Sequence, residues 1–444
     1  MKKTKKLNLE VFQEEVDKKE SKTFCSHLFT GLSLSQKGTA RVCCNNYEVP
    51  KGVDGEELSF YSKDFNIRDV FNSDLHTRIR KNILAGKRDP SCIRCWQTED
   101  NGAESYRTIW NSTLARDHLK TIMLESCNDD AYIKEPFITF LDFTLGNKCN
   151  LVCRMCNLEN SNQWDLESDL LGVFPIWSNT SSTTLTVDKK FLSDEFFVQN
   201  FKHLRQVNFL GGEPLIIDEH YEFLRKCIKF NVAKRIILSY TTNLTVIKEE
   251  LKELWEQFRH VSVGVSVDGV GKVNDYIRYP SKWKNVQKNI KKVSTFQKDV
   301  SMTLQIHATF QLMNVLNWDK LLEWAFSIGE LGFWRIPFSN WVSYPEWHDP
   351  RLLPKDLKDT AIKRINKFID RKKLEDVEWS VGEQQWLGIL KSNLITLEED
   401  YKTEEEFGTI ELVEKIKEHT RLLDLNRGQH TKESIPDLEK FIYG

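Results

Sequence analysis

Residues 137–160, FITFLDFTLGNKCNLVCRMCNLEN, decide the fold of this 444-residue chain. The first ten residues alternate and are rich in β-formers, which predicts a strand that ends at a turn. Cys149, Cys153 and Cys156 follow that turn with the spacing C-x3-C-x2-C. Three thiolates so close together can bind three irons of a cubane cluster and leave the fourth iron open. A zinc loop and three unrelated core cysteines are the alternatives.

Three more strands are predicted downstream, and each ends in small or polar residues. They lie in the stretches RQVNFLGGEPLI (205–216), RIILSYTTNLT (235–245) and VSVGVSVDGVG (261–271). Their ends lie on the same side as the cysteines, where α/β sheets and barrels place their chemistry. Glycines there let a ligand approach the backbone, and a carboxylate can accept hydrogen bonds from an ammonium group. The residues at these strand ends are Gly211, Gly212, Glu213, Pro214, Thr242, Asn243, Ser266, Asp268 and, twelve residues after Ser266, Arg278.

In this order and at these intervals, the motifs resemble those of the radical S-adenosylmethionine (SAM) superfamily. The resemblance covers about residues 137–340. It implies an α/β fold, a partial (β/α)6 TIM-like barrel. It also implies reductive cleavage of SAM to a 5′-deoxyadenosyl radical, which abstracts hydrogen from a substrate. Cys149, Cys153 and Cys156 would hold the [4Fe–4S] cluster that binds SAM.

The resemblance also implies roles for the strand-end residues. Residues 211–214 match the motif that holds the methionine amino group, which places Glu213 near that nitrogen. Ser266 and Asp268 match the region that meets the ribose or the methionyl carboxylate. Arg278 matches an arginine that pairs with this carboxylate, and Asn243 a polar position. Met155 departs from the common aromatic residue, and its thioether would pack on the adenine instead.

A second cysteine group precedes the barrel. The stretch LSLSQKGTARVCC predicts a hairpin that turns at Lys37-Gly38 and brings Cys25 toward Cys43. Cys92 and Cys95, spaced C-x2-C, complete a set of four thiolates. Such a set fits a tetrahedral zinc or a fully ligated [4Fe–4S] cluster, and spacing alone does not separate them.

This segment resembles the SPASM/twitch auxiliary-cluster domain, in which a Gly-x4-Cys hairpin and a later C-x2-C bind a second [4Fe–4S] cluster. Gly38 and Cys43 fit that pattern, which favours Cys43 over Cys44 as the ligand. The position differs, because such a domain usually follows the barrel. The resemblance implies that an auxiliary cluster accepts an electron from the substrate or holds the substrate. His27 is expected to be a surface histidine rather than a ligand.

These patterns divide the chain into an N-terminal twitch/SPASM-like domain (1–107), a helical linker (108–136), the barrel (137–340) and a C-terminal helical extension (341–444). An insertion at about 168–202 is either a lid over the barrel mouth or a plain surface loop. The helices after Pro354 are expected to cover the flank or bottom of the barrel.

Two more strands complete the predicted barrel, VSMTLQIHATFQLMN (300–314) and GFWRIPFSN (332–340). Side chains on these strands would face the substrate beyond the cofactor. His307, Trp334, Arg335 and, on the third strand, Tyr240 are candidate catalytic residues. A buried polar or aromatic residue with its partners inside the protein is the alternative for each.

Composition excludes several classes of protein. The net charge of −2 gives no overall attraction to nucleic acid or to a membrane. No apolar run is long enough to span a bilayer, and the basic start MKKTKKLN lacks the apolar core of a signal peptide. Ten cysteines without an export signal indicate a reducing compartment, which predicts a cytoplasmic protein.

The leading functional hypothesis is radical SAM modification of a peptide or protein, with flavodoxin or ferredoxin as electron donor. The 24 residues before Cys25 are expected to be too few for a separate peptide-recognition domain. One alternative is therefore tailoring of a small molecule, sugar or nucleotide-derived metabolite. Another is a non-catalytic iron–sulfur electron carrier or assembly protein. Glu213 argues against this last alternative, because an electron carrier has no use for an amino-acid clamp.

Overall fold

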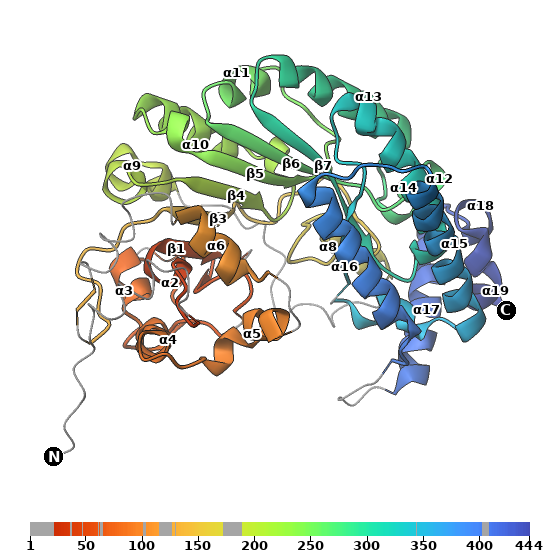
Figure 1. The fold of residues 1–444 in the computed structure, drawn as a ribbon, viewed down its shortest axis with the longest axis horizontal. Helices are drawn as coiled ribbons and strands as arrows, with labels where there is room; N and C mark the ends of the chain where they lie inside the picture. The colour runs from red at the N-terminus through yellow and green to blue at the C-terminus, as the bar shows by residue number, and fades with distance from the viewer. Residues whose placement is uncertain are drawn as a thin grey trace.

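The computed structural model describes residues 22–35, 38–46, 48–60, 62, 65–100, 104–114, 127–128, 130–171, 189–342, 344–401 and 408–444. Its centre is an open, curved sheet of eight strands in the order β2-β1-β3-β4-β5-β6-β7-β8 (Figure 1). The strands are β1 (Gly31–Leu34), β2 (Ala40–Arg41), β3 (Phe140–Thr144), β4 (Gln206–Leu210), β5 (Ile237–Thr242), β6 (His260–Ser266), β7 (Met302–Phe310) and β8 (Phe338–Trp341).

Helices cover the outer face of the curved sheet and lie at its two ends (Figure 1). Before and within the first half of the sheet they are α2 (His27–Thr30), α3 (Ile67–Phe71), α4 (Asp74–Leu84), α5 (Ile93–Asp100), α6 (Tyr106–Leu114), α8 (Trp164–Leu171), α9 (Asp194–Phe201), α10 (Asp218–Lys229) and α11 (Leu251–Trp255). After β6 they are α12 (Lys272–Ile277), α13 (Trp283–Ser294), α14 (Trp318–Ser327), α15 (Lys355–Leu374), α16 (Val381–Glu398), α17 (Thr409–Arg427), α18 (Thr431–Ser434) and α19 (Glu439–Tyr443).

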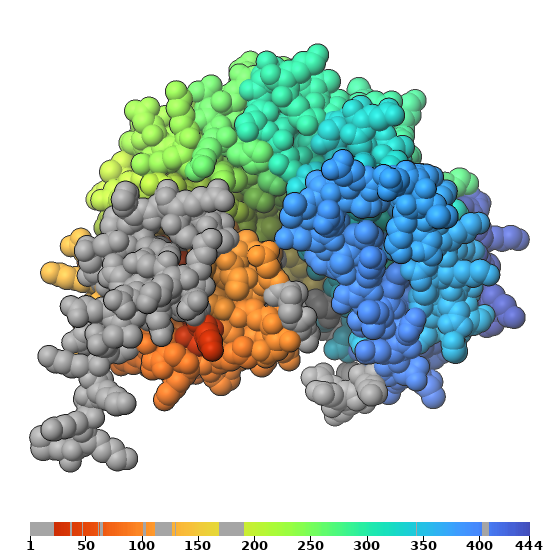
Figure 2. All heavy atoms as spheres, viewed as in Figure 1, coloured from red at the N-terminus to blue at the C-terminus, as the bar shows by residue number. Residues whose placement is uncertain are grey.

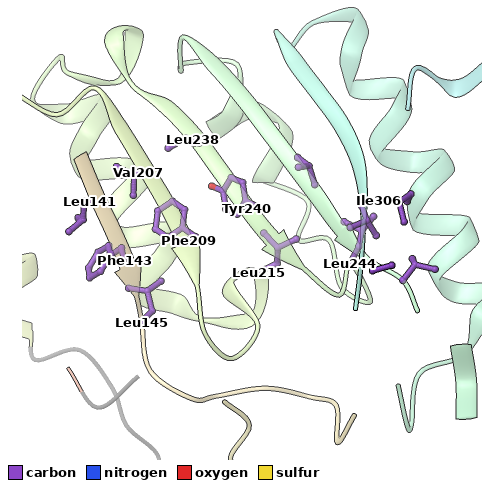
Figure 3. Close-up of a cluster of buried hydrophobic side chains, with 14 of the residues drawn as sticks. Leu141, Phe143, Leu145, Val207, Phe209, Leu215, Leu238, Tyr240, Leu244 and Ile306 are labelled. Atoms are coloured by element: carbon purple, nitrogen blue, oxygen red, sulfur yellow. The ribbon is translucent and has the colours of Figure 1, made fainter. Parts of the chain in front are cut away.

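Strands β3 to β8 are parallel neighbours in sequence order, which is the partial barrel that the sequence predicted. Burial alternates along β4, β5 and β7, as expected for strands with one face under helices. The outer face is apolar: Phe209 of β4 packs against Phe223 of α10. Figure 3 shows this outer core, with Phe143, Phe209 and Tyr240 from three neighbouring strands.

The N-terminal cysteine region continues the barrel sheet. β1 pairs with β2 in antiparallel fashion, which confirms the predicted hairpin, and it pairs with β3 in parallel. Lys37, at the predicted turn, lies outside the described residues. The hydroxyl of Thr139 donates to Thr30 across the same junction at 2.7 Å. The N-terminal region therefore shares a sheet with the barrel instead of forming a separate layer.

The C-terminal helices lie at the other end of the curve from the N-terminal region (Figures 1 and 2). α16 packs along β8, and α17 contacts the short turns that follow β8. The expectation that these helices cover the flank or bottom is incomplete, because α17 also reaches the cysteine-bearing loop after β3. No helix within the described ranges is long and apolar enough to cross a membrane.

The predicted linker and insertion are only partly visible. α6 covers the start of the linker, and Cys127 forms an isolated bridge with Ile133. Residues 115–126 of the linker and 172–188 of the insertion, including Trp177, lie outside the described residues. The predicted lid therefore stays a prediction.

Candidate active site

Residues 147–158, here called the cysteine loop, follow β3 and lie between the ends of β4 and β6. The backbone N–H of Glu213 donates to the carbonyl of Lys148 at 2.9 Å. On the other side, the N–H groups of Val152 and Arg154 donate to the carbonyls of Tyr279 and Ile277 at 2.6 and 2.8 Å. Backbone bonds on two sides therefore fix the loop that carries the three cysteines.

The three thiols of the loop lie close enough to influence one another. Burial, then the neighbouring Cys153 and Glu213, raise the pKa of Cys149 to about 12. Burial together with Cys153 and Cys149 raises the pKa of Cys156, and burial raises that of Cys153 while Arg278 opposes it. Thiols in such a place are neutral until a metal displaces their protons. This donor set fits an iron–sulfur cluster with three cysteine ligands.

The two glycines after β4 let the backbone pass close to the cysteine loop. Gly211 and Gly212 have φ angles of 72° and 53°, a region that L-residues rarely adopt. A Cβ atom on Gly212 would lie 2.3 Å from the carbonyl oxygen of Lys148. A side chain at this position would therefore push the cysteine loop away from the strand end. Pro214 then opens a short 3-10 turn, Pro214–Ile216.

Glu213 is buried, and its carboxylate ties two strand ends together. One oxygen accepts from the Thr242 hydroxyl at 2.5 Å and from the backbone N–H of Leu215 at 3.1 Å. The other accepts from the backbone N–H of Asn243 at 2.6 Å. An ammonium group at this edge would share these oxygens with the protein, because each carboxylate oxygen has a second lone pair.

Asn243 connects β5 to the cysteine loop. Its amide nitrogen donates to the side-chain oxygen of Asn150 at 3.0 Å, and Asn150 donates to Thr245 at 2.8 Å. Met155, between Cys153 and Cys156, is half-buried and packs against the apolar core. Residues predicted from three separate stretches are thus brought together around one loop.

Asp268 and Arg278 form a buried ion pair at the end of β6. Arg278 Nε lies 2.7 Å from Asp268 Oδ2, and Asp268 Oδ1 accepts from the backbone N–H of Thr309 at 2.7 Å. Ser266 is the last residue of β6 and lies opposite His307 of β7. Arg278, which was predicted to pair with the methionyl carboxylate, therefore already pairs with Asp268 in the protein. It also lies near Cys153.

The C-terminal helix α17 supports the cysteine loop, which the sequence did not predict. Arg154, fully buried between two of the cysteines, donates to Asp424 at 2.5 Å and to Gln429 at 3.0 Å. Arg427 donates to the carbonyl of Val152 at 2.8 Å and forms an ion pair with Glu167 of α8 at 2.6 Å. The sequence did contain one signal: an arginine lies between two predicted cluster ligands. A charged side chain that is buried there needs a carboxylate partner, which the neighbouring sequence does not supply.

The four N-terminal cysteines come together around one pocket, here called the N-terminal pocket. Cys25, Cys43, Cys92 and Cys95 all line it. Burial and Cys95 raise the pKa of Cys25 to about 11, and burial and Cys25 raise that of Cys43 to about 12. Cys44 also lines the pocket. The donor set fits a four-thiolate metal centre, and these four residues are the ones that would hold it.

Two observations qualify this pocket. Within the described part of the chain, no group of three or more His, Cys, Asp and Glu side chains is arranged to hold a single metal ion, either in this pocket or in the cysteine loop. His27 is buried, 4% exposed, and its ring packs against Phe140 at 4.8 Å. The expectation of a surface histidine is therefore wrong, because α2 turns this side chain under the first barrel strand.

Tyr240 lies behind the sheet, away from the barrel interior. Its hydroxyl bonds to His220 at 2.8 Å and to Trp255 at 3.1 Å, both on outer helices. These contacts fit the alternative of a buried, satisfied side chain. His307 lies on the inner face, and its ring contacts Phe338 and, on α16, Trp386. Burial lowers the pKa of His307 to about 4, so the ring is neutral at physiological pH.

Trp334 and Arg335 precede the last strand, since β8 begins only at Phe338. The predicted strand 332–340 is therefore confirmed only at its end. Its start is wrong: before Phe338 only an isolated bridge forms, between Phe333 and Leu304 of β7, and Arg335 pairs with a helix instead. Arg335 donates to Glu383 of α16 at 2.7 Å, and the Trp334 ring packs on Trp386 at 4.7 Å. Both side chains therefore contact α16 and help to hold it against the barrel.

The comparison with protein families agrees with this geometry. The family model described as Radical SAM superfamily matches residues 143–316, from the middle of β3 to the residues after β7. The chain contains a radical SAM domain. The matched segment includes the cysteine loop, the glycine turn and the Asp268–Arg278 pair. The matched segment is therefore similar to a catalytic domain.

Individual proteins show more distant similarity. An uncharacterized protein of Methanocaldococcus jannaschii is 26% identical over 136 residues, which are 30% of this chain and 39% of that protein. The structure of anSMEcpe with bound AdoMet has 17% identity and a TM-score of 0.39, and the match covers 55% of this chain and 63% of that one. Both matches span less than two thirds of the other protein.

Streptococcus suis SuiB, solved with the precursor peptide SuiA, has 12% identity and a TM-score of 0.37. That match covers 76% of this chain and 70% of SuiB. These scores are low, and the radical SAM assignment therefore rests on the family model and the residues of the site.

Proposed function

We propose that this enzyme cleaves SAM reductively and uses the 5′-deoxyadenosyl radical to abstract hydrogen from a peptide or protein substrate. The observation that carries the proposal is the meeting of three buried or half-buried thiols with Glu213 and Arg278 at one edge of the sheet. Cys149, Cys153 and Cys156 would hold a [4Fe–4S] cluster with one open iron. When bound, such a cluster supplies the electron that cleaves SAM.

The protein's own residues bind and orient the methionyl end of SAM in this proposal. The turn at Gly211–Pro214 would approach the amino group, with Glu213 sharing a carboxylate oxygen. Arg278 would pair with the methionyl carboxylate while keeping Asp268, and Met155 would cover the adenine. The N-terminal region and α16 border the barrel interior on two sides and would exclude water from the reacting groups.

The N-terminal pocket would hold a second [4Fe–4S] cluster through Cys25, Cys43, Cys92 and Cys95, with zinc as the alternative metal. Its place beside β1 and β3 supports a role at the border of the barrel interior. A flavodoxin or ferredoxin would supply the electron for SAM cleavage.

The test is anaerobic reconstitution followed by iron, sulfide and zinc counts, and then quantification of 5′-deoxyadenosine after dithionite and SAM are added. We expect about eight irons per chain, since each cubane holds about four. Alanine at Cys149, Cys153 and Cys156 removes about half of the iron and all deoxyadenosine. Alanine at Cys25, Cys92 and Cys95 removes the other half and leaves cleavage of SAM in place.

The matched control replaces two buried cysteines outside both groups, Cys127 and Cys227, with alanine. This variant should keep all iron and all deoxyadenosine. About four irons and one zinc in the wild type would contradict the auxiliary cluster alone. Deoxyadenosine from the Cys149/Cys153/Cys156 variant would contradict the main proposal.

A further inference from the structure

A row of polar side chains crosses the inner face of the barrel. Strands β1 and β3 to β7 each contribute one side chain. The strand register aligns these residues as direct neighbours, from β1 to β7. We call this set the interior row. Its members are Ser33, Asp142, Asn208, Ser239, Ser262 and Thr303.

Asp142 is the only charged member of the interior row. It is 2% exposed, and its two oxygens accept from the Ser33 hydroxyl at 2.5 Å and from the Asn208 amide at 2.9 Å. Asn208 in turn accepts from Gln206 at 3.0 Å. These neutral donors all point toward the carboxylate, so the row concentrates hydrogen bonds on one negative charge.

This carboxylate has no described cationic partner. The inward-facing positions of strands β1 and β3 to β8 contain no lysine or arginine and no second carboxylate. Arg41 lies opposite Ser33 on β2, and within the described residues no ion pair joins it to Asp142. Buried carboxylates are normally paired, and an unpaired one at a site is a candidate for ligand binding.

Asp142 is not one of the residues that line the N-terminal pocket, but its carboxylate accepts a hydrogen bond from the side chain of Cys44, which does line it. Tyr106 of α6 lines the same pocket, is 49% exposed, and lies near both Cys44 and Asp142. A carboxylate beside an exposed aromatic ring is a combination that binds organic cations.

We infer that Asp142 binds a positively charged group of the substrate, an ammonium or a guanidinium, between the barrel interior and the N-terminal pocket. The inference rests on the proposed function, because it takes the barrel interior as the substrate site. It disfavours phosphorylated or carboxylate-rich substrates, for which strands β1 and β3 to β8 offer no lysine or arginine. A lysine or arginine side chain of a peptide and a free amine share the required chemistry.

Calorimetric titration of the anaerobically reconstituted enzyme tests the inference with defined probes. The probes are N-acetyl-lysine methylamide, its norleucine and glutamate analogues, and pentylamine. We expect the wild type to bind the lysine probe about tenfold or more tightly than the norleucine probe, as for hydrogen bonds to charged groups. If pentylamine binds as tightly as the lysine probe, the natural ligand is a free amine. If pentylamine binds more weakly than the lysine probe, the natural ligand is a peptide.

Asp142→Asn should abolish the preference for the lysine probe. Asp349→Asn is the matched control, because Asp349 is a buried aspartate that pairs with Arg351 outside the barrel interior. This control should keep the full preference. Equal wild-type binding of the lysine and norleucine probes, or preference for the glutamate probe, overturns the inference without requiring any variant to fold.

The same preparations are assayed for 5′-deoxyadenosine, which separates the two proposals. A wild type that produces deoxyadenosine but shows no cation preference overturns the inference and leaves the proposed function intact. A wild type that shows the Asp142-dependent preference but no deoxyadenosine supports the binding site and contradicts the proposed function.

Discussion

The cysteine loop and the N-terminal pocket gather thiols in different ways. The loop carries three cysteines within eight residues, and backbone bonds from the end of β4 and the end of α12 hold it. The pocket collects four cysteines from three separate segments, and the β1–β2 hairpin together with side-chain packing brings them together. The three cysteines of the loop are therefore close in sequence, but residues far along the chain hold them in place. The four cysteines of the pocket are far apart in sequence, but all belong to the N-terminal region.

The largest expected effect comes from removing the distant anchor of the cysteine loop. Asp424→Ala leaves the Arg154 guanidinium buried without its anionic partner, which costs about 3–5 kcal/mol. We expect a lower urea midpoint by tryptophan fluorescence, together with iron loss at the cysteine loop. The control is Glu250→Ala, which breaks an exposed pair with Arg225 and costs about 0–1 kcal/mol. Equal effects of both variants would mean that α17 does not anchor the loop.

The next prediction separates close packing from backbone strain at the same loop. Gly212→Ala adds a Cβ atom 2.3 Å from the Lys148 carbonyl, and such overpacking costs about 1–3 kcal/mol. Gly271→Ala shares a positive φ of 64° but meets no atom within 4 Å. We expect the first variant to lose iron and SAM affinity, measured by iron count and equilibrium dialysis. If Gly271→Ala loses as much iron and SAM affinity as Gly212→Ala, backbone strain at a positive φ explains both losses and close packing does not.

A smaller effect is expected in the N-terminal pocket. Asp89 caps the turn Pro90–Cys92 by accepting from the backbone N–H of Ser91 at 3.0 Å. Asp89→Ala should cost about 1–2 kcal/mol and release metal from the pocket, while deoxyadenosine formation persists. Asn66→Ala removes the cap of α3 in the same region, at a distance from the cysteines. It should cost about the same stability and release no metal.

The smallest prediction concerns the border between the pocket and the barrel. Burial raises the pKa of Asp142 from 3.8 to about 6. The folded state therefore holds its proton to higher pH than the unfolded chain, so stability falls as the pH rises through this window. Between pH 5 and 7 the wild type should lose about 1 kcal/mol relative to Asp142→Asn, measured by urea unfolding. Parallel pH profiles would mean that the carboxylate has a counter-charge.

Much of this fold could be predicted, because each barrel strand is a short β-forming run that ends in glycine or polar residues. The strand ends also brought Glu213, Asn243 and Asp268 to the cysteine loop without any knowledge of side-chain contacts. The last strand was predicted to begin too early, since Arg335 stands in a run of β-formers but pairs with Glu383 of α16.

Two features depend on contacts that local patterns do not encode. Arg154 and Asp424 are 270 positions apart, and nothing near either residue specifies the other. The interior row had a weak signal, a polar residue within each of its strands, as in FLDFT and QVNFL. The strand register is needed to show that these residues are neighbours on one face of the sheet.

The pairing of β1 with β3 has a consequence for the order in which the protein assembles. Ser33 and Asp142 are 109 positions apart, so the hairpin between Cys25 and Cys43 has to wait for β3 before it gains its second neighbour. β3 leads directly into the cysteine loop. A single strand-pairing event therefore joins the hairpin before Cys43 to the strand that leads into the cysteine loop. The frame of the N-terminal group depends on this event, whereas the frame of the cysteine loop is completed later in the chain, by Glu213, Tyr279 and α17.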